Sequence, residues 1–113
     1  MRASATDRLA HVKTTISRIR ELLTGRTSNV LDEDPLVRAA YERFLEVISE
    51  ASRHLPEVYR TRHPEIPWRQ VAGLGNHIRH GYYAVDREVL WQIFEYDLDQ
   101  LEAAIDDLIA NPS

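Results

Sequence analysis

The sequence contains no cysteine, so disulfide bonds, thiolate nucleophiles, cysteine-ligated zinc sites and iron–sulfur clusters are all excluded. It also lacks any apolar run near the ~20 residues that cross a bilayer. The N-terminal segment has no apolar stretch of the kind found in secretory signals. No segment alternates apolar and polar residues with a period of two, as a half-buried strand would. We therefore expect a cytoplasmic protein that contacts no membrane and is built from helices.

The charges, 14 basic and 18 acidic side chains, are unevenly distributed along the chain. Basic residues are in excess in residues 1–26 and 53–85, and acidic residues are in excess in 27–52 and 86–113. Two interpretations fit this alternation: helices that pair oppositely charged faces, or a basic groove that accepts a phosphate backbone. The length of 113 residues suits one helical domain with one core.

Apolar residues recur every three or four positions along four segments, which is typical of helices with one buried face. The expected helices cover about residues 4–23, 35–55, 67–80 and 86–109. Residues that favour helix starts or stops lie at the segment ends: Pro35, Asp86, Gly25, Pro56 and Gly81. Residues 57–65 show no strong period and are interpreted as a loop with room for one short helical turn. The predicted fold class is an all-α, up-and-down bundle of four main helices with room for one extra short helix.

The segment "LGNHIRHGYYAVD", residues 74–86, gathers polar groups that can do chemistry. In the third expected helix, Asn76 and His80 lie four positions apart and stack on a face turned away from the apolar stripe. The residues that flank this face or lie below it are His77, Arg79, Arg69 and Gly73. The sequence therefore predicts an exposed face that offers imidazole, amide and guanidinium groups.

These groups suit RNA cleavage without a metal. Such a reaction needs a group that takes the proton of the ribose 2′-OH, a group that protonates the leaving oxygen, and a cation for the phosphorane charge. Histidine, whose ordinary pKa is about 6.5, can fill either proton-transfer role, and the fork of an arginine suits the phosphate. Asn76 is then a candidate to orient His80 or to contact a phosphate oxygen. The alternative interpretation is a solvated polar helix end.

A metal site is the next alternative for the same segment. His77 and His80 could share an ion, but no third ligand lies near them in sequence, and a stable site normally needs three or four. We therefore expect no metal and no other cofactor. A second group of basic residues, in the least regular part of the chain, either touches phosphate or belongs to a solvated loop: His54, Arg60, Arg62 and His63.

Glycines and tryptophans complete the pattern. Gly73 and Gly75 inside a helix cost about 1 kcal/mol each relative to alanine, so we expect a compensation such as the close approach of another chain or of a substrate. Trp68 and Trp91 are expected to cap the core at the ends of the bundle. Of Tyr82 and Tyr83, one is expected to pack inward and the other to reach solvent.

A family resemblance covers residues 37–109. The run "IPWRQVAGLGNHIRHGYYAVDREVLWQIFEYDLDQL", with "AAYERFLEVISEASRHLP" upstream, resembles the HepT-like branch of the HEPN superfamily. The features that carry the resemblance are Trp68, the Gly-x-x-Asn-x-x-x-His-x-Tyr pattern from Gly73 to Tyr82, the Val85-Asp86 turn and Trp91. The resemblance implies a small helical bundle that pairs as a two-fold homodimer, and a metal-independent ribonuclease that acts as a toxin. It also implies an antitoxin partner, a minimal nucleotidyltransferase of the MntA type, which silences the toxin by adding AMP to a tyrosine.

The resemblance also implies residue roles. Asn76 and His80 match the active-site Asn and His, and Tyr82 matches the tyrosine that accepts AMP. The family has an arginine immediately before the Asn, where this sequence has Gly75, so Arg79 is the candidate substitute cation. His77 and Arg69 are candidate RNA contacts, and the helical glycines would let two chains approach closely across a dyad. The second hypothesis is a catalytically inactive dimeric module that binds or regulates a nucleotidyltransferase.

Overall fold

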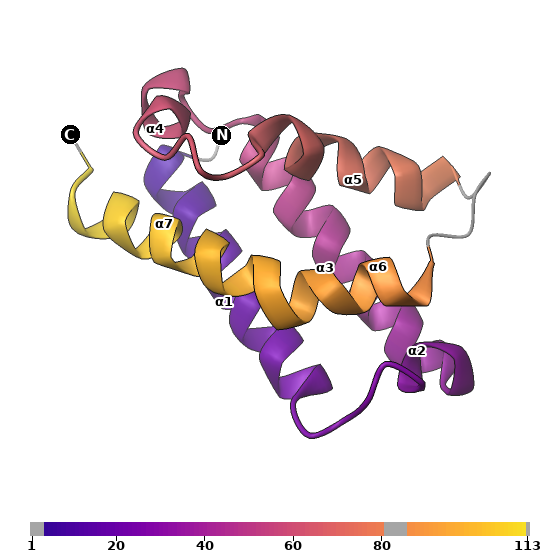
Figure 1. The fold of residues 1–113 in the computed structure, drawn as a ribbon. Coiled ribbons are helices and arrows are strands. Elements are labelled where there is room, and N and C mark those ends of the chain that lie inside the picture. Colours follow the sequence, from indigo (N-terminus) through magenta and orange to yellow (C-terminus); the bar gives the residue numbers. More distant parts are fainter. Residues whose placement is uncertain (1–3, 81–85, 113) are drawn as a thin grey trace.

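The computed structural model describes residues 4–80 and 86–112, and every element in these two ranges is helical (Figure 1). In chain order the elements are α1 (Ala5–Leu23), α2 (Val30–Glu33), α3 (Pro35–Arg53), α4 (Glu57–Thr61), α5 (Trp68–His80), α6 (Arg87–Gln92), the π-helical turn η1 (Ile93–Asp97) and α7 (Leu98–Ala110). Because α6, η1 and α7 follow one another without a break, the long elements are α1, α3, α5 and the α6–η1–α7 helix. The predicted all-α bundle is confirmed.

Polar caps begin the long helices where the sequence indicated. The Ser4 hydroxyl accepts a hydrogen bond from the Asp7 amide, and the Asp7 carboxylate accepts one from the Ser4 amide. Asp34 accepts two amide hydrogen bonds at the start of α3, and Asp86 accepts one at the start of α6. Gly25 has a φ of 85°, which fits the chain reversal after α1. These local signals explain why the predicted helix starts agree with the structure.

Two elements differ from the sequence prediction. The pattern did not indicate the short helix α2, and it indicated one continuous α-helix where the structure has the η1 turn. The buried Tyr41 hydroxyl donates to the Leu90 carbonyl at 2.5 Å and accepts a hydrogen bond from the Phe94 amide. An α-helix would join that carbonyl to that amide, so the inserted hydroxyl widens the turn. Tyr41 belongs to α3, and periodicity within the last helix carries no sign of it.

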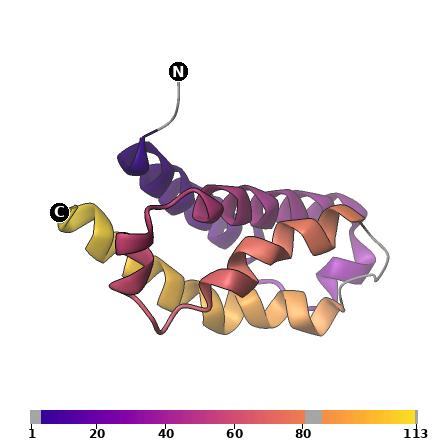
Figure 2. The same cartoon turned by 90° about the horizontal axis from the view of Figure 1, so that it is seen from above.

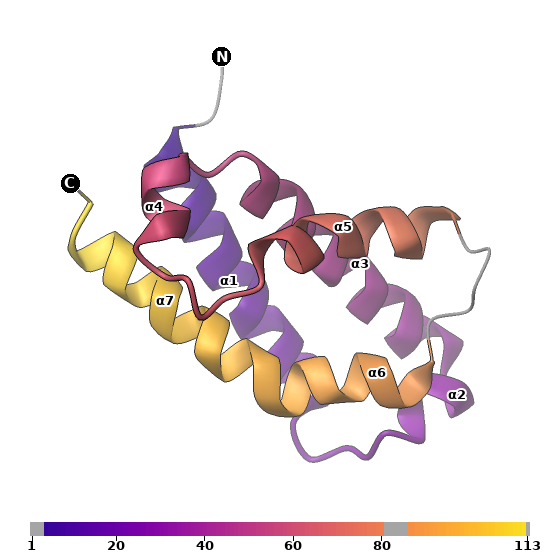
Figure 3. The same cartoon turned by 45° about the horizontal axis from the view of Figure 1, so that its top comes forward.

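The core lies among α1, α3 and α6–η1–α7. Its largest fully buried side chains include Leu9, Ile16, Ile19, Leu23, Tyr41, Leu45, Leu90, Leu98, Ile105 and Leu108. α1 packs against α3 and α7, whereas the packing of α5 is mainly on α3, which lies beside it in both views (Figures 2 and 3). The fold therefore has a three-helix centre, with α5 attached along one side.

Ion pairs join the basic first helix to the acidic last one. Lys13 contacts Glu102 and Asp106 at 2.9 Å each, and Arg20 contacts Asp99 and Glu102 at 2.8 and 2.9 Å. For these two segments the charge alternation in the sequence reflects helices that pair oppositely charged faces. Within the part of the chain that the structure describes, we find no helix long and apolar enough to cross a membrane.

Candidate functional site

The predicted site residues lie on α5, the least buried of the long helices. Asn76, His77, Arg79 and His80 are all exposed, and so is Arg69 two to three turns earlier. The opposite side of the helix carries Val71, Leu74 and Ile78, which are half-buried and pack against the core. The predicted division of α5 into an apolar face and a polar face is confirmed, and Asn76 and His80 share the polar one.

Gly75 is the buried point of α5 and lies against Ser49 of α3. The Gly75 amide donates to the Ser49 hydroxyl oxygen at 3.0 Å, and that hydroxyl donates to the Ala72 carbonyl at 2.8 Å. A Cβ atom on residue 75 would lie 2.9 Å from Ser49 Oγ and 3.1 Å from Ser49 Cβ. The expectation that this glycine serves the approach of a second chain was wrong, because the close neighbour is α3 of the same chain. Gly73, by contrast, faces open space.

Arg79 lies on the α3 side of the polar face. Its Nη1 atom is 3.4 Å from the position that a Cβ on residue 75 would occupy, so the guanidinium reaches back one helical turn beside the glycine. The hydrogen bond from His54 lowers the pKa of Glu50, and the charges of Arg53, His54 and Arg79 lower it further against the effect of burial. The guanidinium therefore sits near Glu50, at the edge of a groove of about 470 Å³ between α1, α3 and α5.

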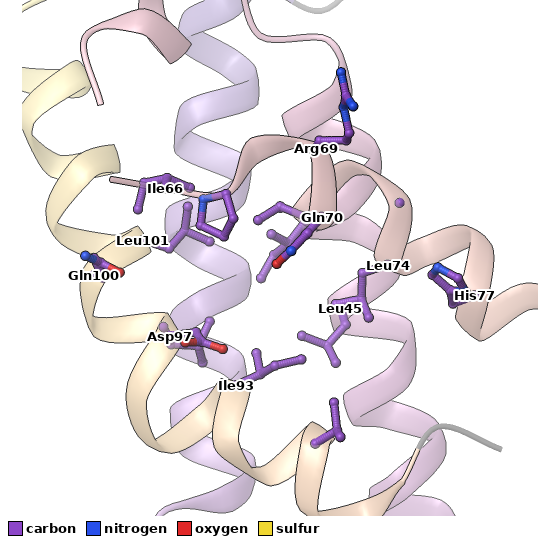
Figure 4. Close-up of a pocket in the computed structure, with 16 residues that line it drawn as sticks. Leu45, Ile66, Arg69, Gln70, Leu74, His77, Ile93, Asp97, Gln100 and Leu101 are labelled. Carbon is purple, nitrogen blue, oxygen red and sulfur yellow. The ribbon is translucent and has the colours of Figure 1, made fainter. Parts of the chain in front are cut away.

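An apolar cleft lies on the other side of α5 (Figure 4). It has a volume of about 660 Å³ and separates α5 from the α6–η1–α7 helix, with α3 at its base. Its apolar lining includes Leu45, Ile48, Val71, Leu74, Val89, Ile93 and Leu101, and its polar lining is Arg69, Gln70, His77, Asp97 and Gln100. The two candidate RNA contacts, Arg69 and His77, thus border this cleft, with the Arg69 guanidinium turned away from it in Figure 4.

Two residues of the second basic group, Arg62 and His63, form a packed junction between the segment that follows α4 and the end of α7. His63 Nδ1 lies 3.0 Å from Glu65, and His63 Nε2 lies 2.7 Å from Asp107, which also contacts Arg62 at 3.2 Å. Burial opposes the charged imidazole, but the hydrogen bonds to Glu65 and Asp107 outweigh it and raise the pKa of His63. Arg62 and His63 therefore hold this junction together through internal ion pairs, whereas His54 is exposed and pairs with Glu50 of α3.

Both tryptophans pack with the core, Trp91 as a buried member and Trp68 as a partly buried one. The Trp68 indole donates to the carbonyls of Arg60 and His63, and the Trp91 indole donates to Glu95 and packs at 5.0 Å against Phe94. Within residues 4–80 and 86–112, no three His, Asp or Glu side chains converge as metal ligands would. Gly81, Tyr82 and Tyr83 lie outside the described residues, so the predictions for them stay predictions.

Comparison with known proteins identifies the class to which this fold and site belong. A family model described as "Ribonuclease HepT-like" matches residues 12–108. The chain is 36% identical over 92 residues to the "Probable ribonuclease HepT" of Thermococcus cleftensis. The aligned region covers 78% of this chain and 84% of that protein. It is 27% identical over 101 residues to a "Putative RNase" of Caldanaerobacter subterraneus subsp. tengcongensis, which covers 89% of this chain and 90% of that protein. No solved structure gives a significant match.

A third relative gives a similar result. A "Putative RNase" of Methanocaldococcus jannaschii is 32% identical over 78 residues, which cover 69% of this chain and 72% of that protein. The matched family region includes α5 with Asn76 and His80, together with the helices that surround it. This chain belongs to the HepT-like ribonuclease family.

Proposed function

We propose that this protein is a metal-independent endoribonuclease that acts in the cytoplasm as the toxin of a HepT/MntA-type toxin–antitoxin pair. The observation that carries the proposal is the polar face of α5, where Asn76 and His80 are exposed together and the Arg79 guanidinium lies at the α3 edge, beside Gly75. Membership in a ribonuclease family supplies the substrate class. The face offers the three kinds of group that metal-independent RNA cleavage needs.

The proposed reaction is transfer of the phosphoryl group to the neighbouring ribose oxygen. A neutral His80 takes the proton of the 2′-OH, the 2′ oxygen forms a bond to phosphorus, and the bond from phosphorus to the 5′ oxygen breaks. A protonated imidazole then donates its proton to the leaving 5′ oxygen, which leaves a cyclic phosphate and a free hydroxyl. Arg79 and Asn76 stabilise the charge that develops on the phosphoryl oxygens.

Two proton-transfer roles and one His80 per chain call for a homodimer. In the proposed dimer two α5 helices meet at a two-fold axis, so that one imidazole acts as base and its symmetry mate as acid. The apolar cleft beside α5 supports this arrangement, because Leu74, Val89 and Ile93 leave an apolar surface next to the polar face. A second copy of the chain would cover that surface and double the groups along one RNA-binding furrow.

The proposed antitoxin is an MntA-type nucleotidyltransferase that adds AMP to Tyr82. Tyr82 follows His80 by two residues, so the adduct would add bulk and negative charge next to the site and repel the phosphate backbone. Co-expression with such an enzyme should increase the intact mass by one AMP group. The Tyr82→Phe variant should lose the modification, whereas the control Tyr83→Phe should keep it; AMP on Tyr83 alone would contradict the assignment.

The second candidate function is a catalytically inactive dimeric module that binds or regulates a nucleotidyltransferase. Gly75 favours it, because the family resemblance implies an arginine at this position and the contact with Ser49 is too tight for a side chain to enter without a shift. Loss of a guanidinium from such a site should cost a few kcal/mol of transition-state stabilisation unless another group replaces it.

RNA cleavage by the purified protein in EDTA separates the two candidates. The active-toxin proposal predicts that His80→Ala lowers the rate at least a hundredfold, because general acid–base catalysis contributes at least that much. The control is His11→Ala, which removes an exposed imidazole from α1. Equal rates for wild type and His80→Ala would reject the nuclease and leave the binding module.

A further inference from the structure

The contact between α3 and α5 lies next to the Arg79 guanidinium. Ser49 is only 2% exposed, yet its hydroxyl is fully used: it donates to the Ala72 carbonyl and accepts from the Gly75 amide. Both partners are backbone groups of α5, in the turn that precedes Asn76. A side chain of α3 thus holds the backbone of the helix that carries the polar face.

The space at residue 75 is closed to a side chain. Besides Ser49 Oγ at 2.9 Å, a Cβ there would meet Ser49 Cβ at 3.1 Å, and that atom is fixed to the backbone of α3. Any larger residue would therefore require Ser49 or α5 to shift by a few tenths of an ångström. The observed contact between α5 and α3 thus favours glycine over arginine at residue 75.

The Arg79 guanidinium borders the same position. Arg79 is one turn after Gly75, and its Nη1 atom lies 3.4 Å from the place that a Cβ on residue 75 would take. Since Gly75 has no side chain, the arginine can fold back along the helix and place its charge beside Gly75, on the α3 side of the polar face. The negative field of Glu50, whose pKa the Arg79 charge helps to lower, favours this placement.

We propose that Ser49, Gly75 and Arg79 form one coupled unit. Ser49 is a positioning residue that fixes α5 on α3, and Gly75 provides the space in which Arg79 becomes the phosphate-binding cation. The RNA-binding part of this inference rests on the proposed ribonuclease function. In this unit, residue 75 is glycine for a structural reason. Arg79 then supplies the guanidinium of the site, although residue 75 is not an arginine.

The first test needs no activity, because it compares two glycines of the same helix by thermal unfolding. Gly73→Ala should raise the melting temperature, since its Cβ meets no atom within 4 Å and alanine favours a helix. Gly75→Ala should lower the melting temperature, and in a Ser49→Gly background the same change should no longer lower it. Equal increases for both alanine variants would overturn the proposal.

The second test moves the arginine and measures RNA cleavage at a temperature where every variant is folded. Arg79→Ala should lose activity, and adding Gly75→Arg should not restore it while Ser49 is present. Adding Ser49→Gly to that double variant should restore part of it, because the space at residue 75 is then open. Full recovery with Ser49 in place would overturn the coupling.

The positioning role of Ser49 has its own readouts. Ser49→Ala should lower kcat roughly tenfold with little change in KM and no change in the pH profile, because it displaces the reacting groups without altering their chemistry. It should also shift the His80 imidazole signals in an NMR spectrum while those of His11 stay in place. If the wild type fails to cleave RNA, the proposed function fails, and the melting temperatures and NMR signals still decide the coupled unit. Unchanged His80 signals would overturn it.

Discussion

The helices α5 and α7 have the same length of 13 residues but are held in the molecule in opposite ways. α7 buries five residues and is tied to α1 by ion pairs through Glu102 and Asp106. α5 buries only Gly75 among the described residues, packs mainly on α3, and borders an open apolar cleft. Stability is thus concentrated in the α1–α3–α7 centre, whereas the chemistry-bearing side chains lie on the helix that leaves most of its surface available to a partner.

The helix α3 makes a buried polar contact with the helix on each side of the cleft. Ser49 places its hydroxyl in the backbone of α5, and Tyr41 places its hydroxyl in the backbone between α6 and η1. Each contact is polar, buried and directional, so each sets the position of a helix more sharply than apolar packing alone. Two hydroxyl groups of α3 thus contact the backbones of the helices on either side of the cleft.

The largest expected difference between the two helices comes from deleting one aliphatic side chain on each. Ile105→Ala in α7 removes a fully buried side chain and should lower the free energy of unfolding by about 2–5 kcal/mol. Leu74→Ala in α5 should cost about 1 kcal/mol in the monomer, because that side chain is half-buried and lines the cleft. Urea unfolding at low protein concentration measures both. Equal losses would show that α5 is held as firmly as α7.

An intermediate effect is expected at the π-helical turn. Tyr41→Phe removes the hydroxyl that separates the Leu90 carbonyl from the Phe94 amide. The free energy of unfolding should fall by about 1–2 kcal/mol through the lost buried hydrogen bond, and the turn should revert to α-helical bonding. A crystal structure of the variant should then show the Phe94 amide bonded to the Leu90 carbonyl. A retained π-helical turn in the variant would mean that something other than this hydroxyl causes it.

The smallest effect is expected from pH at the junction that anchors the end of α7. Glu65 and Asp107 raise the pKa of His63, so protonated His63 stabilises the fold most below the pKa of an unfolded histidine, and this contribution disappears as the pH rises through the higher folded value. Hydrogen bonding to His63 lowers the pKa of Asp107, whose contribution is lost as the pH falls through that lowered value. The stability advantage of wild type over His63→Gln should therefore shrink between pH 6 and 8.5. A constant difference across that range would contradict the charged pairing, and His11→Gln, which replaces an exposed imidazole on α1, serves as the control.

Much of the site could be predicted because it depends on spacing along one helix. Asn76 and His80 share a face at an interval of four, and the apolar stripe opposite them fixes which face is free. The contacts between helices could not be predicted from the sequence. Ser49 looks like an ordinary polar residue of α3, and nothing in the sequence pairs it with Gly75, so the glycine pattern indicates only the close approach of another chain or of a substrate.

The sequence by itself determined the helices, their caps, the two faces of α5 and the family, because all of these are encoded in local periodicity, capping residues and a short motif. The tertiary structure alone decided which α3 side chains enter the backbones of neighbouring helices, and on which side of α5 the Arg79 guanidinium lies. Those outcomes depend on the distance between elements far apart in the chain, and fractions of an ångström at Gly75 settle them. Residue spacing along one helix contains no information about such distances.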